Sequence, residues 1–180
     1  DGRAPLAAQL RYRVMDFDGR VLQQQQQAVT LAPLAATEIM RLSDAALLKG
    51  ADPRRTLAVF ELLGADKVLA QRIVSFAAPK EQLLAADQVQ AELRAEGDHY
   101  RLRLNSRSLA RALWIDFDNA KADVEDNAFD LLPGQPHDVV VRSRADLSIL
   151  RAALRLQTLG DALHSHPAPS QDNASVQRIP

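Results

Sequence analysis

Residues 88–104 read QVQAELRAEGDHYRLRL, with apolar and polar side chains alternating along both arms of the stretch. The residues that share the apolar face are Val89, Ala91, Leu93, Ala95, Tyr100, Leu102 and Leu104. A period of two is typical of a half-buried strand. The intervening Glu96-Gly97-Asp98 predicts a tight turn, because glycine adopts positive φ at little cost. The stretch therefore predicts an antiparallel β-hairpin with one face toward a core.

The same alternation extends outward from this hairpin in both directions. Further strands are predicted at residues 6–14, 21–31, 37–42, 55–63 and 67–77 upstream, and around 113–117, 139–142 and 154–159 downstream. The only helices expected are short: residues 45–48 after the cap Ser43-Asp44, and residues 147–152 after Asp146. Neither helix is long enough to cross over between parallel strands. The sequence thus predicts an all-β fold made of two tandem immunoglobulin-like β-sandwich domains.

The boundary between the two domains is expected near Pro79. Proline removes a donor from a strand ladder, and the apolar alternation lapses here and restarts in a new register. We place the first sandwich at residues 1–78, a linker at 79–87 and the second sandwich at 88–160. Residues 161–180, rich in Ser, Pro, Gln and Asn toward the end, are expected to form a disordered tail.

Composition excludes several classes of function. The net charge is −1 with acids and bases interleaved, so no nucleic-acid partner is expected, and no apolar run is long enough to span a membrane. There is no cysteine, which excludes disulfides and thiolate chemistry, and the seven glycines form no phosphate-binding loop. No cofactor-binding residue is expected. The glutamine tract at residues 23–27 is interpreted as a solvated sheet edge.

An acid-rich segment, residues 116–130, is the one stretch that looks like a site. Three interpretations compete: an irregular calcium site, a pair of glycosidase carboxylates, and loop acids that are solvated or cap backbone donors at turns. An EF-hand loop that begins at Asp116 would need glycine and glutamate where Lys121 and Asn127 stand. The capping interpretation is favoured, and no residue is assigned as catalytic or as a metal ligand.

Trp114, the single tryptophan, is expected on the face opposite Leu113, Ile115 and Phe117. It could pack against a neighbouring domain, turn inward through a β-bulge, or serve as a stacking platform for a sugar. Structural packing is favoured over ligand contact.

Residues 126–136 read DNAFDLLPGQP. This run resembles the D-N-y-F-D-L-L-P-G-e signature near the end of β-mannosidases in glycoside hydrolase family two. The segment before it, LWIDF at 113–117, is similar to that family's preceding strand, and the Pro79-Lys80-Glu81 linker resembles the join between its last two sandwiches. The resemblance covers most of residues 1–160, with Ala128 in place of the usual aromatic. The signature residues themselves suit a strand and a turn, which is a structural role.

The resemblance implies a non-catalytic, C-terminal accessory region of an exo-acting, retaining β-mannosidase that hydrolyses terminal β-D-mannose residues from β-mannosides. The family's catalytic glutamates lie on an upstream (β/α)₈ barrel, which would be the partner of this region, and β-mannosides would be bound through that barrel. The family also has a strand before the position of Asp1, so the first sandwich is expected to lack its first strand.

A free-standing carbohydrate-binding or adhesion module with the same fold is the alternative. The Ala- and Arg-rich composition favours a bacterial source. We expect a periplasmic or secreted protein, with a cytoplasmic location as the alternative.

Overall fold

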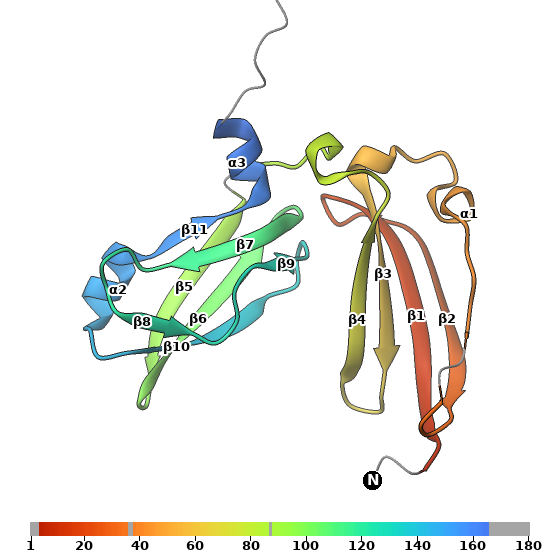
Figure 1. Cartoon of the computed structure of the whole chain (residues 1–180), viewed down its shortest axis with the longest axis horizontal. Helices are drawn as coiled ribbons and strands as arrows, with labels where there is room; N and C mark the ends of the chain where they lie inside the picture. The colour runs from red at the N-terminus through yellow and green to blue at the C-terminus, as the bar shows by residue number, and fades with distance from the viewer. Residues whose placement is uncertain (1–3, 36–37, 87, 166–180) are drawn as a thin grey trace, which may run out of the picture.

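The computed structural model describes residues 4–35, 38–86 and 88–165. Its described residues form two halves that stand side by side and meet at one end (Figure 1). None of the described helices is long and apolar enough to cross a bilayer.

The first half is built on one antiparallel sheet with the strand order β2-β1-β3-β4. The strands are β1 (Leu6–Asp16), β2 (Val21–Leu31), β3 (Thr56–Leu63) and β4 (Val68–Ser75). As predicted, the nearly continuous apolar run forms a central strand, β3, and the glutamine tract lies in the edge strand β2. Gly19 in the β1–β2 turn has φ of 92°, the conformation for which glycine was expected there.

One face of this sheet is covered by the segment between β2 and β3 rather than by a second sheet. The buried residues Tyr12, Val14 and Ala58 pack with Met40, Leu42 and Leu47 of that segment. Helix α1 (Asp44–Leu48) begins where predicted, because the Ser43 side chain accepts a hydrogen bond of 3.3 Å from the Ala46 N–H. The strand predicted at 37–42 is wrong over its described residues 38–42, which run without strand pairing. Thr37 lies outside the described residues.

The second half is a sandwich of two sheets around one core. One sheet has the order β5-β6-β10-β8 and the other the order β11-β7-β9. The bounds are β5 (Val89–Glu96), β6 (His99–Ser106), β7 (Ala110–Asp116), β8 (Ala122–Val124), β9 (Phe129–Leu131), β10 (His137–Ser143) and β11 (Arg155–Gln157). The predicted hairpin is present as β5–β6, with Gly97 at φ of 62°. Leu113, Ile115 and Phe117 all point into the core, as their alternation predicted.

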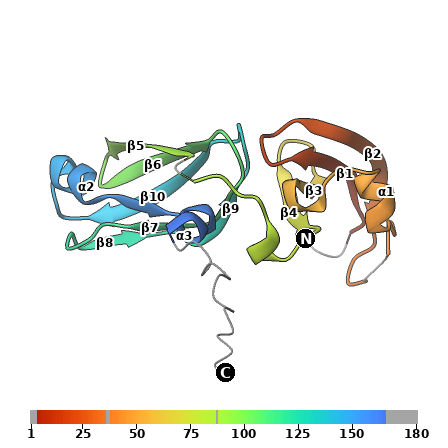
Figure 2. The same ribbon diagram turned by 90° about the horizontal axis from the view of Figure 1, so that it is seen from above.

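Two short helices complete this half. Helix α2 (Leu147–Ala153) follows Asp146 as expected, although the Asp146 side chain makes no capping hydrogen bond. Helix α3 (Leu159–Ser165) packs beside β7, on the side of the sandwich opposite β5 and β6 (Figure 2). The prediction that the tail starts at residue 161 is therefore wrong for residues 161–165. These residues are helical because Leu159 and Leu163 pack against a buried apolar cluster. The rest of the expected tail, 166–180, lies outside the described residues.

The segment between the halves is part of the packed structure. A 3₁₀ turn (Pro79–Glu81) is followed by Gln82 and Leu84, which are both buried. The Leu83 N–H donates a hydrogen bond of 3.0 Å to the Arg54 carbonyl of the first half. The linker expected at 79–87 is thus fixed to both halves over its described residues.

Gly160 in α3 marks a close approach between this helix and the linker. A Cβ atom built there would lie 2.2 Å from the carbonyl oxygen of Ala85, which is too short for the backbone to tolerate. We expect Gly160→Ala to displace α3 and to lower the free energy of unfolding by about 1–3 kcal/mol, the usual range for overpacking. Thermal unfolding followed by circular dichroism would measure this loss. Ala162→Gly, also on α3, is the control and is expected to cost about 1 kcal/mol through its lower helix propensity. Gly50→Ala would not serve as a control, because Gly50 has positive φ.

Candidate functional site: the interdomain joint and the cleft beneath it

The segment 126–136, which carries the predicted signature, stabilises a break in the strand pairing of β7. Ala112 has φ of 48°, and the pairing of β7 with β9 shifts between Ala110 and Leu113. Asn127 takes the place of a strand partner at this point: its Oδ1 accepts from the Ile115 N–H at 2.8 Å, and its Nδ2 donates to the Ile115 carbonyl at 2.9 Å. An amide side chain suits this place because its oxygen accepts while its nitrogen donates, so it can pair with an N–H and a carbonyl of the same residue.

Asp130 holds the other side of the same irregularity. Its Oδ1 accepts from the Ala112 N–H at 2.9 Å, and its carboxylate lies 3.3 Å from Arg111. Arg111 also reaches the first half, donating to the Ser75 hydroxyl at 2.8 Å and to the Gln82 side-chain carbonyl at 3.1 Å. Asp130 and Arg111 therefore tie β9 and β7 to β4 and the linker.

Behind these polar contacts lies a buried apolar cluster that both halves share, here called the interdomain joint. Its buried members are Met15, Phe17, Leu57, Val59, Leu84, Leu109 and Leu132. The Leu109 N–H donates a hydrogen bond of 2.7 Å to the Phe17 carbonyl, so the two backbones meet directly. Pro133 of the signature lies against Gly19, where an added Cβ would come within 3.0 Å of the proline ring. The signature is thus a structural element that joins the two domains.

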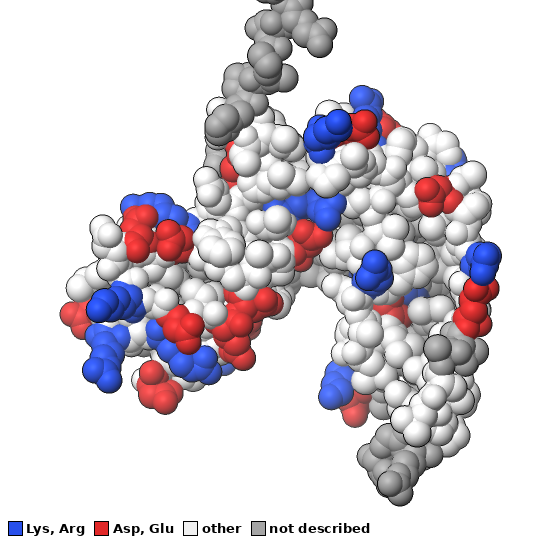
Figure 3. Space-filling model, in the orientation of Figure 1, with Lys and Arg blue, Asp and Glu red and all other residues white. Residues whose placement is uncertain are grey.

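Beneath the joint the two halves diverge and leave a cleft. The space-filling view shows the hollow between them, and acidic side chains gather on its second-half wall over the β8–β9 loop (Figure 3). One hollow of about 340 Å³ is lined by Gln71 of β4 and by residues 129–132 and 135–137. An adjoining one of about 450 Å³ is lined by residues 71–73, Ala128 and Asp130. Gln71 and Asp130 line both hollows.

On the wall formed by the first half, a buried glutamate organises the polar side chains. Glu61 is 3% exposed, and its carboxylate accepts from Arg11 at 2.9 Å, from Arg13 at 3.3 Å and from the Gln71 side-chain amide at 3.3 Å. Burial raises the pKa of Glu61, but the hydrogen bonds from Arg11 and Gln71 and the charges of both arginines outweigh burial and hold the pKa below its ordinary value. The Nε–H of Arg13 is buried and has no acceptor among the described residues.

The acidic residues of segment 116–130 do not form a metal site among the described residues, where no group of three or more His, Asp or Glu side chains converges. Several of them cap backbone donors or form ion pairs, and Asp123 and Glu125 are exposed. Asp116 accepts from the Phe117 N–H at 2.8 Å, and Asp118 pairs with Arg155 at 2.8 Å. Asp126 lies 3.6 Å from His137, whose ring packs on Phe129 at 4.5 Å between centroids. Asp116, Asp118 and Asp126 thus make contacts of the kind that the capping and solvation interpretation expects, and the assignment of no catalytic residue or metal ligand stays a prediction.

Trp114 is 51% exposed on β7, directly opposite Gln157 of β11. The bulge expected as one alternative is present at Ala112, but alternation resumes at Leu113 and leaves the indole outside. The interpretation that Trp114 turns inward is wrong. The other two interpretations of Trp114, contact with a neighbouring domain and stacking on a sugar, stay predictions.

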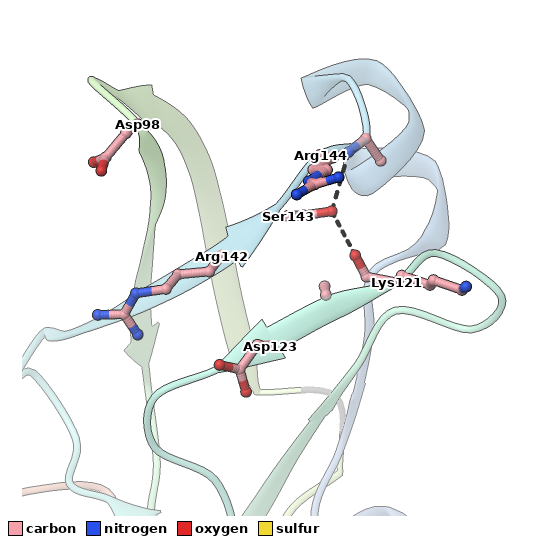
Figure 4. A pocket seen from close by; sticks show the side chains of 8 residues that line it. Asp98, Lys121, Asp123, Arg142, Ser143 and Arg144 are labelled. Atoms are coloured by element: carbon pink, nitrogen blue, oxygen red, sulfur yellow. Dashed lines mark hydrogen bonds between the residues drawn. The ribbon is translucent and has the colours of Figure 1, made fainter.

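A larger, open hollow of about 760 Å³ lies at the far end of the second half (Figure 4). Charged residues from three segments line it: Asp98, Lys121, Asp123, Arg142 and Arg144. Figure 4 shows the Lys121 and Arg142 side chains pointing in different directions, so their charged ends do not converge on one ligand position. Ser143 is occupied by hydrogen bonds to the Lys121 carbonyl and the Ala145 N–H. This hollow is therefore a weaker candidate than the interdomain cleft.

The fold and the joint define a class of protein: a tandem pair of immunoglobulin-like domains that share a core where they meet. Residues 1–81 match the Mannosidase Ig/CBM-like domain, and residues 84–162 match the Ig-fold domain. The chain therefore belongs to the mannosidase-type immunoglobulin-like domains, which confirms the predicted family and all-β fold class.

A solved structure supports this fold. The β-D-mannosidase from Dictyoglomus thermophilum is similar with a TM-score of 0.64 at 18% sequence identity, over 87% of this chain. The similar region is 19% of the length of that enzyme, so this chain corresponds to a small part of it. A search of curated proteins finds no significant match.

Asn127 gives a direct test of the structural role of the signature. We expect Asn127→Ala to lower the free energy of unfolding by about 2 kcal/mol, because it leaves the N–H and carbonyl of Ile115 without their partner. Chemical denaturation would measure the loss. Asn119→Ala, on an exposed turn of the same half, is the matched control and should change stability by less than about 0.5 kcal/mol. Equal effects of the two substitutions would contradict the assigned role.

Proposed function

We propose that this chain is the non-catalytic, C-terminal accessory region of an exo-acting, retaining β-mannosidase that hydrolyses terminal β-D-mannose from β-mannosides. The observation that carries the proposal is the tandem order of the two mannosidase-type domains, joined without a free linker. Such a pair presents its outer surfaces to a partner as one unit. The partner is an upstream (β/α)₈ barrel of the same protein, which holds the catalytic glutamates and binds the β-mannoside.

The surface of the first half supports a packing role. Exposed apolar side chains gather at the end of its sheet that lies away from the joint, where Leu6 begins β1 and Val68 and Leu69 begin β4. An apolar surface of this kind favours contact with another part of a larger protein. Trp114, exposed on the second half, offers a further contact of the same type.

The test is a comparison of hydrolysis by this chain and by the product of its gene extended upstream of the codon for Asp1. We expect the extended product to release p-nitrophenol from p-nitrophenyl β-D-mannopyranoside, and the 180-residue chain to release none. An upstream reading frame without a barrel, or an extended product inactive on β-mannosides, would refute the proposal. The free-standing binding module would then account better for the chain. Bacterial origin and a periplasmic or secreted location stay predictions.

A further inference from the structure

We infer that the cleft between the two domains is a binding site for an uncharged oligosaccharide. This inference concerns the chain itself and does not depend on a catalytic barrel, although it would give the proposed accessory region a direct contact with the polysaccharide. The cleft is formed by both domains, and ligand sites occur preferentially at such interfaces. Its two adjoining hollows, of about 340 and 450 Å³, are of the size that ligand sites use.

The chemistry of the lining fits a ligand with many hydroxyl groups and no net charge. Gln71, Gln135 and His137 provide amide and imidazole groups that can each donate or accept. Within the hollows, Arg72 and Asp130 bring one charge of each sign, and the other acidic side chains on the second-half wall of the cleft are not part of this lining. Hydroxyl groups can both donate and accept, and such a mixed lining suits them.

An apolar surface within the same cleft is supplied by two rings. Phe129 and His137 pack at 4.5 Å with an interplanar angle of 50°, and both line the hollow beside Gln71. The C–H face of a pyranose ring is apolar and can rest on such a surface while its hydroxyl groups reach the polar lining. The hollows lie between β4 and β9, each an edge strand of its sheet among the described residues, and preferential binding of an extended peptide there would overturn the inference.

The polar wall of the cleft is held in place before any ligand binds. The Gln71 amide nitrogen donates to Glu61, which is fixed in turn by Arg11, and this orients the Gln71 side-chain oxygen as an acceptor. A wall whose side chains are already fixed loses little conformational entropy on binding.

The experiment is isothermal titration calorimetry of the 180-residue chain with β-1,4-linked mannohexaose, combined with ¹H–¹⁵N spectra of the backbone and side-chain amides. We expect saturable binding and shifts of the Gln71 and Gln135 side-chain amides. Gln71→Ala and His137→Ala should each weaken binding about three- to tenfold, the effect of losing one hydrogen bond to an uncharged group. Gln90→Ala, an exposed glutamine of β5 outside both hollows, is the matched control and should bind as the unchanged chain does.

Trp114, the single tryptophan, lies outside the lining of both hollows, so its fluorescence should not change on binding. Absence of saturable binding at millimolar mannohexaose would overturn the inference. So would binding whose spectral shifts centre on Trp114 or on Arg142 of the far hollow. Salt-sensitive binding of sulfated oligosaccharides in preference to mannohexaose would likewise overturn it. Circular dichroism of each variant confirms that it is folded, and none of these outcomes depends on hydrolysis by a longer protein.

Discussion

Replacing Leu109 by alanine is expected to lower the free energy of unfolding by about 3 kcal/mol and to weaken both domains at once. Leu109 is 1% exposed and belongs to the interdomain joint, where it packs with Leu57 and Val59 of the first sheet. The cavity left by Leu109→Ala would therefore lie between the domains rather than within one of them. Because the joint supplies much of the apolar cover for one face of the first sheet, that sheet should lose protection although the substitution lies outside it.

Hydrogen exchange at individual backbone amides, together with thermal unfolding, would measure both effects. We expect the unchanged chain to unfold in one transition, and Leu109→Ala to increase exchange in β3 as well as in β7. Leu102→Ala provides the matched control, because Leu102 is also fully buried but lies inside the core of the second half. The control should cost a similar free energy and increase exchange in the second half first. If Leu109→Ala left the amides of β3 as protected as before, the two domains would be independent and the joint would be a passive contact.

The strands could be predicted from the sequence because their signals are local. Alternation placed Leu113, Ile115 and Phe117 in the core, and the uncharged glutamine tract predicted the edge strand β2. The predicted structural role of the signature agrees with its contacts, since a turn and a strand end can be recognised from Pro133-Gly134 and the residues before them. Each of these features depends on neighbours within a few residues of the chain.

The joint could not be predicted in the same way, because its members come from distant segments with no common pattern. Leu109 lies between strands, where no alternation marks it as buried, and Leu132 follows the end of β9. Residues 38–42 have the alternation of a strand, yet Met40 and Leu42 pack on the first sheet without a pairing partner. Periodicity predicts which face of a segment is buried, but it cannot say what covers that face.

The burial of Glu61 and its need for cationic partners could have been predicted from the sequence, but were not. Glu61 interrupts the apolar run of β3 at a position in phase with Leu57 and Val59, so a buried charge there required cationic partners. Those partners, Arg11 and Arg13, lie 50 and 48 residues away and alternate on β1, which pairs directly with β3. Only the pairing of the two strands brings the three charges together.

Replacing Glu61 by glutamine is expected to lower the free energy of unfolding at neutral pH by about 3 kcal/mol, because it leaves two largely buried arginines without their counter-charge. The effect should depend on pH in a defined direction. The folded-state pKa of Glu61 lies below its ordinary value of 4.5, so its ionised form contributes stability that is fully present above pH 4.5. That contribution is lost as the pH falls through the folded-state pKa. The difference between Glu61→Gln and the unchanged chain should therefore be full at neutral pH and shrink on acidification.

Urea denaturation of both proteins between neutral pH and about pH 3 would measure this difference. Glu92→Gln is the matched control: Glu92 pairs with Arg94 at the surface, where both side chains are mostly exposed, and its loss should change stability by less than about 0.5 kcal/mol at every pH. If Glu61→Gln were as stable as the unchanged chain at neutral pH, the cost of burying the charges would cancel their attraction. The role of Glu61 would then lie in orienting Gln71, and the substitution should weaken the binding of mannohexaose in the cleft while leaving the fold intact.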